Sequence, residues 1–272
     1  AGPTLAPPWP MLAISIGRTG AAAALAVGRA SGGQTHLIQI LAPRAHTDAF
    51  DLILCPAHDG VRGSRVISMR GSVPDISPAR LSSLRMLHPQ GAELASPRTV
   101  VLLGGPHRSV RLVREDLADL VDRMQLWTAT AGSLSVIGSR RTPLAWRQAL
   151  APLRERAACW WFDDADGPNP YPMALAWGER FVVTPDSVNM LSEAAATGCP
   201  VYMLAPRPAR GRLAEFHRSM LEAGDVRLLG EHPHASPNPA SNELERVLPD
   251  IRRTLRERGL PLAKVVDHST DN

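Results

Sequence analysis

Short apolar runs alternate with helical patterns along almost the whole chain, and this alternation constrains the fold more than any other feature. Ten runs are expected to form strands: 11–16, 35–40, 51–55, 65–69, 99–105, 133–139, 159–162, 181–185, 201–204 and 226–229. Eight segments are expected to form helices: 19–31, 78–87, 113–126, 143–157, 170–178, 187–198, 209–224 and 241–258. The strands are almost uniformly apolar, which is typical of sheets with both faces covered. The sequence therefore predicts an α/β protein with parallel sheets in Rossmann-like domains.

Two interruptions of the alternation predict the domain organisation. Between Ala42 and Asp75 the strands follow one another too closely for full helices, and HPQGAELASPRT (88–99) breaks the pattern with Pro, Gly and Ser. We therefore expect an N-terminal α/β domain over 1–92 and a C-terminal α/β domain over 93–240. The last segment, 241–272, begins with an amphipathic helix that is expected to pack back on the N-terminal domain.

Composition and charge argue against several classes of protein. The formal net charge is +4, and nearly all basic residues are arginines, since Lys264 is the single lysine. The chain has no lysine-rich tail and no basic run interleaved with aromatics, so nucleic acid is not expected as a partner. No apolar run approaches the roughly 18–20 residues that span a bilayer. The first apolar run also lacks the basic stretch that precedes it in a signal peptide.

The cysteines and histidines indicate neither disulfides nor a metal site. Cys55, Cys159 and Cys199 are odd in number and far apart, and the nine histidines show no metal-ligand spacing. Reduced thiols are typical of the cytoplasm, where we expect the protein, with the inner face of the membrane as an alternative. The chain has no G-x-G-x-x-G, G-x-S-x-G or P-loop lysine motif. NAD, serine-hydrolase chemistry and P-loop chemistry are therefore not indicated, and no cofactor is expected.

Polar residues that follow the expected strands are the first candidates for a site, because doubly wound sheets bind ligands outside the carboxyl ends of their strands. Ser139, Arg140, Arg141 and Thr142 lie between the strand at 133–139 and a helix. Hydroxyls, backbone N–H groups and two guanidinium groups at such a position suit a phosphate. The alternative is that Thr142 caps the helix while the arginines are solvated.

Two further strand-to-helix loops offer groups that suit a nucleotide. Asn169 and Tyr171 open one helix, and Tyr171 could stack on a base or ribose or simply cover the loop. Asp186 and Ser187 precede another helix, on which Glu193 lies. Glu193 could accept both hydroxyls of a ribose, and Ser187 with the first amides could hold a diphosphate. The alternative is an Asp or Ser cap with an ordinary surface glutamate.

The remaining candidates lie in loops that follow three other expected strands. His58 and Asp59 are adjacent after an expected strand and could supply a general base, although such a pair in a loop is also compatible with a structural role. Glycines after two other strands allow close backbone approach. The residues at these two loops are Gly17, Arg18 and Thr19 in the first half and Gly104, Gly105 and His107 in the second.

These segments together resemble one known family. GRTGA, CPAHDGVRG, LLGGPHR, GSRRTP, NPYPMALAWGERFVVTPDSVNMLSEAAATGCPVYML and FHRSMLEAG are similar to the family named for the plant mitochondrial fission factor ("elongated mitochondria"), which also has bacterial members. The resemblance runs from about Pro8 to Leu229 and is most specific over 184–193 and 197–202. The family is related to the nucleotide-sugar glycosyltransferases of the GT-B fold. The resemblance therefore implies two α/β domains that face a cleft.

The resemblance also implies roles for residues and a function. Ser139, Arg140 and Thr142 would approach the diphosphate of a donor, as would Ser187, and Glu193 would bind the ribose. The expected function is transfer of a sugar from a nucleoside-diphosphate sugar to an acceptor that the sequence does not identify, such as one of the cell envelope. The alternative is a non-catalytic scaffold that recruits membrane-remodelling partners, which would entail peripheral association with a membrane.

Overall fold

The computed structural model describes residues 6–43, 46–230, 233 and 243–260. The chain divides by its contacts into two compact units, with the divisions after Met69 and after Glu243. Unit 1 therefore combines the N-terminal part of the chain with the C-terminal helix, and unit 2 is the segment between them. Both units are built on a parallel sheet, which confirms the α/β class expected from the sequence.

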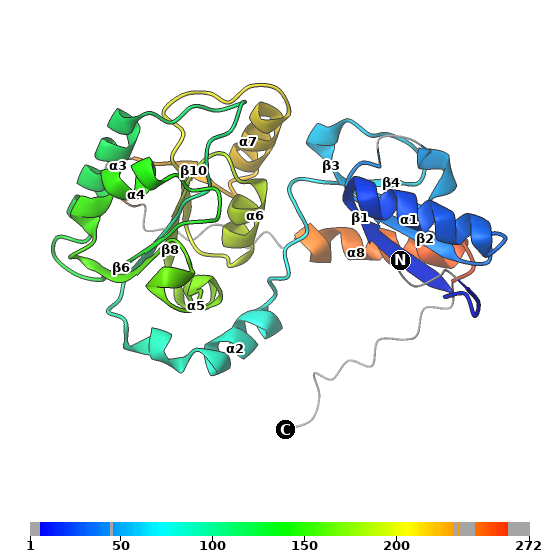
Figure 1. Cartoon of the computed structure of the whole chain (residues 1–272), viewed down its shortest axis with the longest axis horizontal. Coiled ribbons are helices and arrows are strands. Elements are labelled where there is room, and N and C mark those ends of the chain that lie inside the picture. The colour runs from blue at the N-terminus through cyan, green and yellow to red at the C-terminus, as the bar shows by residue number, and fades with distance from the viewer. Residues whose placement is uncertain (1–5, 44–45, 231–232, 234–242, 261–272) are drawn as a thin grey trace. The chain divides into compact units, whose positions relative to one another are not determined.

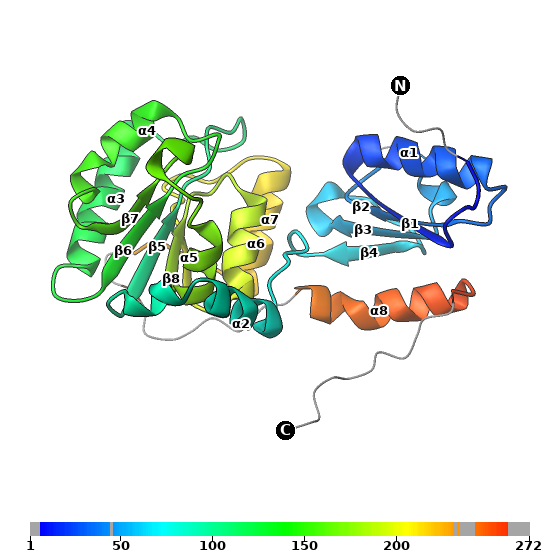
Figure 2. The ribbon, with the colours of Figure 1, turned by 60° about the horizontal axis from the view of Figure 1, so that its bottom comes forward.

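Unit 1 holds a four-stranded sheet in the order β1-β2-β3-β4, and every neighbouring pair is parallel. Its strands are β1 (Leu12–Ile16), β2 (His36–Ile40), β3 (Leu52–Pro56) and β4 (Val66–Met69). Helix α1 (Gly17–Ala30) covers one face of this sheet, and α8 (Glu243–Glu257) lies along the other (Figure 2). The Arg246 guanidinium on α8 donates to the Ser68 carbonyl oxygen at 3.0 Å.

Unit 2 holds a six-stranded parallel sheet in the order β10-β9-β8-β5-β6-β7. Its strands are β5 (Arg98–Leu102), β6 (Ser133–Ile137), β7 (Ala157–Trp161), β8 (Arg180–Val183), β9 (Val201–Met203) and β10 (Arg227–Leu228). The first strand in the sequence, β5, lies in the middle. The chain adds β6 and β7 on one side of it, then returns to add β8 on the other. The strand order therefore reverses between β5 and β8, where doubly wound sheets bind ligands.

Helices cover both faces of the sheet in unit 2 (Figure 1). They are α2 (Pro78–Leu87), α3 (Arg114–Trp127), α4 (Leu144–Ala149), α5 (Tyr171–Trp177), α6 (Val188–Ala196) and α7 (Arg212–Glu222). Successive side chains of a strand point to opposite faces of the sheet, so β5 and the residue after it contribute to two cores. Val100 and Leu102 belong to the core beneath α6 and α7, whereas Val101 and Leu103 belong to the core beneath α3.

The structure corrects one helix that the sequence predicted. The helix expected over 143–157 ends as α4 at Ala149, and a short 3-10 turn over Ala151–Leu153 follows it. Pro152 in this turn has no backbone N–H, and its ring would clash with a carbonyl of the preceding helical turn. The strand expected at 159–162 accordingly begins earlier, at Ala157.

The division between the units also differs from the expected boundary near residue 92. Helix α2 lies before that boundary in the sequence but packs on α5 in unit 2, where the Arg85 guanidinium donates to the Ala176 carbonyl at 2.8 Å. The Pro- and Gly-containing stretch that suggested a boundary forms a 3-10 helix over Pro89–Glu93. The indole N–H of Trp177 on α5 donates to the His88 carbonyl at 2.8 Å, beside this 3-10 helix. Across the described residues, none of the helices has both the length and the apolar character that crossing a membrane requires.

Candidate functional site

The reversal of strand order brings the ends of β5 and β8 against each other with almost no space between them. A Cβ atom on Gly104 would lie 2.2 Å from Asp186 Oδ2, and one on Gly105 would lie 2.3 Å from the backbone oxygen of Arg141. Both distances are far below a van der Waals contact. Glycine is therefore required at both positions for the three loops that follow β5, β6 and β8 to meet.

A buried carboxylate, Asp186, holds these three loops together. Its side chain is 2% exposed. One oxygen accepts from the Gly105 backbone N–H at 2.9 Å and from the Arg141 guanidinium at 2.8 Å, and the other accepts from the Thr184 hydroxyl at 2.7 Å. The Thr184 oxygen in turn accepts the Gly104 N–H at 2.8 Å. A buried charge is tolerated only when its oxygens are hydrogen-bonded and its charge is compensated, and here both conditions are met.

The loop after β6 is fixed to the same point through its hydroxyl groups. Thr142 Oγ1 accepts from the Ser139 N–H at 2.8 Å and donates to the Gly104 carbonyl at 2.5 Å. Ser139 Oγ donates to that carbonyl at 3.1 Å. Thr142 therefore does not cap α4, which was one of the two alternatives left by the sequence. Its hydroxyl orders the loop so that Arg140 is exposed at the rim.

Seven of the nine predicted donor-binding residues line one pocket of about 580 Å³ in unit 2, which we call the Tyr171–Glu193 pocket. The seven residues are Ser139, Arg140, Arg141, Asn169, Tyr171, Ser187 and Glu193. The pocket lies at the carboxyl ends of the strands, among the loops after β6, β7 and β8. Its other lining residues include Trp161, Phe162 and Asn189, which the sequence did not single out as ligands. Its volume lies in the range of known sites for small molecules and cofactors.

Tyr171 and Glu193 are coupled inside this pocket. The Tyr171 hydroxyl donates a short hydrogen bond to the Glu193 carboxylate, and both side chains are half-buried. Burial raises the pKa of Glu193 above its ordinary value, and the hydrogen bond from Tyr171 opposes that rise. Burial also raises the pKa of Tyr171, and the nearby Glu193 charge raises it further. Tyr171 therefore stays a protonated donor, while Glu193 keeps acceptor capacity for a ligand.

The first turn of α6 forms another part of the pocket wall. The Ser187 hydroxyl caps the helix, because it accepts from the Met190 N–H at 3.4 Å. The cap hydrogen bond is long, and Ser187 and the exposed Asn189 both line the pocket. The amides of a helix's first turn have no carbonyl partner within the helix and carry the positive end of its dipole. Anionic groups are stabilised at such a position.

The other predicted residues lie elsewhere. Thr142 and Asp186 do not line the Tyr171–Glu193 pocket, because their side chains are used in the hydrogen bonds that join the loops. Five more belong to unit 1: Gly17, Arg18 and Thr19 begin α1 directly after β1, and His58 and Asp59 form a 3-10 turn directly after β3. Near the turn at His58 and Asp59, the pKa of the Cys55 thiol is raised to about 11, mainly by burial and further by the Asp59 charge. Among the described residues, no group of three His, Cys, Asp or Glu side chains is placed to hold a metal ion.

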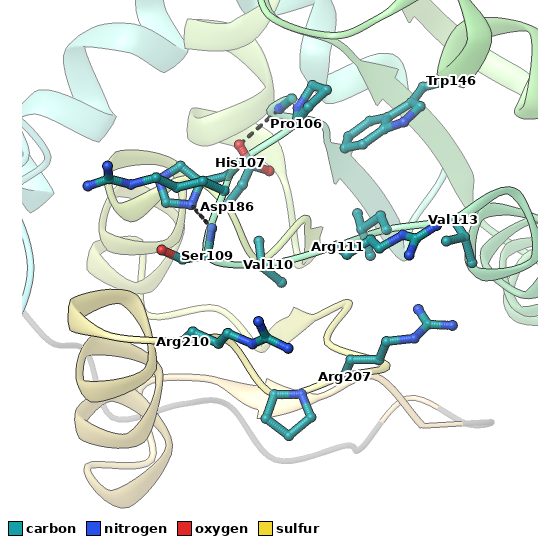
Figure 3. Close-up of a pocket in the computed structure, with 14 residues that line it drawn as sticks. Pro106, His107, Ser109, Val110, Arg111, Val113, Trp146, Asp186, Arg207 and Arg210 are labelled. Atoms are coloured by element: carbon teal, nitrogen blue, oxygen red, sulfur yellow. Dashed lines mark hydrogen bonds between the residues drawn. The ribbon is translucent and has the colours of Figure 1, made fainter.

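A second cavity, of about 770 Å³, lies in unit 2 between the loop after β5 and the loop after β9 (Figure 3). We call it the arginine pocket, because Arg108, Arg111, Arg207 and Arg210 line it. The predicted cleft residues Gly105 and His107 line it too, as does Asp186. Sequence reasoning did not anticipate the four arginines. The signal was the pair of basic loops PHRSVR and RPARGR, each of which follows an apolar strand.

Comparison with solved structures identifies the fold. The structure matches a putative UDP-N-acetylglucosamine 2-epimerase from Listeria monocytogenes with a TM-score of 0.52 and 14% identity, covering 91% of this chain and 75% of that one. It matches the UDP-GlcNAc 2-epimerase from Neisseria meningitidis bound to UDP-GlcNAc with a TM-score of 0.52 and 14% identity, covering 89% and 68%. At such identities the likeness shows the fold alone. The fold is of the GT-B type, with two parallel-sheet α/β units.

Sequence comparison then gives the family. Residues 1–255 match the family model described as Mitochondrial fission ELM1, and the chain belongs to this family. The mitochondrial fission protein ELM1 of Arabidopsis thaliana is 30% identical over 281 residues, which cover 93% of this chain. The uncharacterized protein RP120 of Rickettsia prowazekii (strain Madrid E) is 27% identical over 154 residues, which cover 55% of this chain. The matches span 66% of the Arabidopsis protein and 43% of the Rickettsia protein.

The junction at Asp186 predicts a large loss of stability for Asp186→Asn. The amide would present its N–H group or a weaker, uncharged oxygen to the Gly105 N–H, and it would leave Arg141 without its counter-charge. We expect the free energy of unfolding of unit 2 to fall by about 3 kcal/mol, which urea denaturation followed by tryptophan fluorescence would measure.

The matched control is Asp163→Asn. Asp163 is 58% exposed and pairs with Arg147, so the same change of side chain should alter stability by less than about 1 kcal/mol. Equal effects of the two substitutions would contradict the role assigned to Asp186.

Proposed function

We propose that unit 2 binds a nucleoside-diphosphate sugar in the Tyr171–Glu193 pocket and that the protein transfers the sugar to an acceptor. The observation that carries the proposal is the convergence of a ribose-type acceptor, Glu193, with phosphate-type donors from the loops after β6 and β8 in one pocket. The loops come from separate parts of the chain, so their convergence is a property of the fold. The pocket lies outside the carboxyl ends of the strands, and doubly wound sheets bind ligands at this position.

The geometry suggests how each part of the nucleotide would be held. Glu193 would accept hydrogen bonds from the ribose hydroxyls, with Tyr171 fixing the orientation of its carboxylate. Trp161 and Phe162, which also line the pocket, would offer apolar contact to the base. Asn169 orders the loop before α5, because its side-chain oxygen accepts from the Tyr171 N–H at 3.0 Å. The backbone of this loop would close the site beside Tyr171.

The diphosphate would lie between the loop after β6 and the first turn of α6. Ser139 and Ser187 offer hydroxyl groups there, and Arg140 offers a guanidinium group that is exposed at the pocket. When the bond between the sugar and the diphosphate breaks, negative charge grows on the diphosphate. Positive groups fixed in advance at that position stabilise the charge and so lower the barrier.

Both candidates for the base, and three of the residues predicted for the cleft or acceptor, lie in unit 1. Transfer requires a base that accepts the proton of the acceptor's nucleophile, and His58 and Asp59 are the candidates. Gly17, Arg18 and Thr19 would contact the acceptor at the start of α1. The Neisseria epimerase was solved with UDP-GlcNAc bound. Since this chain resembles it in fold alone, the comparison supports a nucleotide-sugar donor only through the fold.

One observation favours a second candidate function, in which the protein is a scaffold for other proteins. Among the described residues, strand β1 lies at the edge of the sheet in unit 1. Ile14 and Ile16 on this strand are 60% and 63% exposed, and Met11 just before it is 55% exposed. Exposed apolar side chains in a row on an edge strand are typical of a surface that pairs with a partner. The Arabidopsis relative is named as a mitochondrial fission protein.

Replacement of Glu193 by Gln tests the donor site. Gln keeps the acceptor for the Tyr171 hydroxyl but loses the charge that ribose hydroxyls would contact. We expect one nucleotide among UDP, GDP, ADP and CDP, with its sugar derivative, to bind the native protein, and the variant to bind it about tenfold more weakly in isothermal titration calorimetry.

Glu215→Gln on the exposed side of α7 is the matched control and should bind like the native protein. Absence of binding of every nucleotide to a folded sample would overturn the donor-site proposal and leave the scaffold function as the stronger candidate. Turnover is measured separately, as release of the free nucleotide from its sugar derivative.

Nucleotide-sugar affinity should also depend on pH through Glu193. Its pKa lies above the ordinary value in the folded protein, and the ionised form is the better acceptor for ribose hydroxyls. Affinity is therefore expected to be full above this raised pKa and to fall as the pH drops through it, at a pH higher than an unperturbed glutamate would give. A nucleotide sugar is the suitable probe, because its diphosphate has no group that titrates in this range. The Glu193→Gln variant should show a flat profile, and an unchanged slope in the variant would exclude Glu193 as the titrating group.

A further inference from the structure

The arginine pocket is separate from the proposed nucleotide site. The two cavities share no lining residue, and the ion pair between Arg141 and Asp186 stands between them, with Arg141 on one wall and Asp186 on the other. Both cavities open at the carboxyl ends of the strands in unit 2. A ligand of the arginine pocket would therefore lie beside a nucleotide without occupying its place.

The two loops that form the arginine pocket are fixed to each other. The Arg210 backbone N–H donates to the Ser109 carbonyl at 2.8 Å, which joins the loop after β9 to the loop after β5. Within the loop after β5, an isolated β-bridge pairs His107 with Val110, and His107 Nδ1 accepts from the Ser109 N–H at 3.2 Å. Figure 3 shows Arg207 and Arg210 on one side of the cavity and Arg111 on the facing loop. The backbone segments that carry the four arginines are thus held next to each other.

The charges around the cavity do not cancel. Arg207 pairs with Asp116 at 2.6 Å, and the Asp186 charge is used by Arg141. Within the described part of the chain, Arg108, Arg111 and Arg210 form no ion pair with a carboxylate. Like charges that line one cavity repel one another when the cavity is empty, and an anion that enters it offsets this repulsion. Three guanidinium groups without a carboxylate therefore favour a multiply charged anion.

The chemistry of the walls narrows the class of anion. Arginine presents a planar fork of N–H groups that matches the oxygens of phosphate in pairs. Trp146, Pro106 and Pro208 add apolar surface to the same cavity, and this suits a ring or carbon chain attached to the phosphate. A volume of about 770 Å³ exceeds what a bare phosphate requires.

We propose that the arginine pocket binds the phosphate monoester group of a second ligand, separate from the nucleotide. The phosphate could belong to a soluble sugar phosphate or to a lipid headgroup, since both present the same dianionic group. Binding itself does not require the nucleotide site.

The test is titration of the full chain with inorganic phosphate and with glycerol 3-phosphate at fixed ionic strength, followed by calorimetry. We expect saturable binding that falls at least tenfold in the double variant Arg108→Gln/Arg210→Gln. The matched control, Arg154→Gln/Arg156→Gln, removes the same charge from exposed positions of unit 2 and should bind like the native protein. No saturable binding, or an equal loss in both double variants, would overturn the proposal.

Two further arms separate this inference from the nucleotide proposal and identify the source of the phosphate. Arg140→Gln should leave phosphate binding intact, and a loss there would place the phosphate in the Tyr171–Glu193 pocket and overturn the inference. Arg108→Gln/Arg210→Gln should still bind the nucleotide that the native protein binds. Co-sedimentation with phosphatidylcholine vesicles, with and without phosphatidic acid, distinguishes a lipid headgroup from a soluble ester: phosphatidic-acid-dependent binding that the double variant loses supports the lipid source.

Discussion

The carboxylate of Asp186 is the interaction on which the rest of the site depends. It accepts from a backbone amide after β5, from a hydroxyl after β8 and from a guanidinium after β6, so one buried charge joins the three loops at the reversal of strand order. The close contact exists only because Gly104 and Gly105 leave room for it. The two cavities described above adjoin this junction. A change there would move the walls of the Tyr171–Glu193 pocket and of the arginine pocket together.

Much of the fold follows from local sequence patterns. All ten expected strands occur, since short, uniformly apolar runs between turn residues favour buried strands, and β3, β6 and β8 are buried along their whole length. The helix expected over 143–157 was too long, because Pro152 ends helical hydrogen bonding after α4. The division between the units was placed differently because the packing of α2 on α5 joins segments far apart in the sequence. Composition near residue 90 carries no information about such a contact.

The site was predictable where it depends on position after a strand. Tyr171, Glu193 and five other residues that follow strands share one pocket, since the carboxyl ends of parallel strands meet at one edge of the sheet. The role of Asp186 was not predictable, because an acidic residue before a helix can contact a ligand, the helix end or another loop. The local sequence does not distinguish these three arrangements. The arginine pocket needed two loops from distant parts of the chain, and only the three-dimensional structure brings Ser109 and Arg210 together.

The central claim is that unit 2 holds a nucleoside diphosphate between Tyr171, Glu193 and the start of α6. The most direct measurement is a crystal structure of the chain grown with an equimolar mixture of UDP, GDP, ADP and CDP. We predict density for one nucleotide with its ribose hydroxyls on the Glu193 carboxylate and its diphosphate beside Ser139 and Ser187. A nucleotide bound elsewhere, or an empty pocket in crystals saturated with all four, would contradict the account.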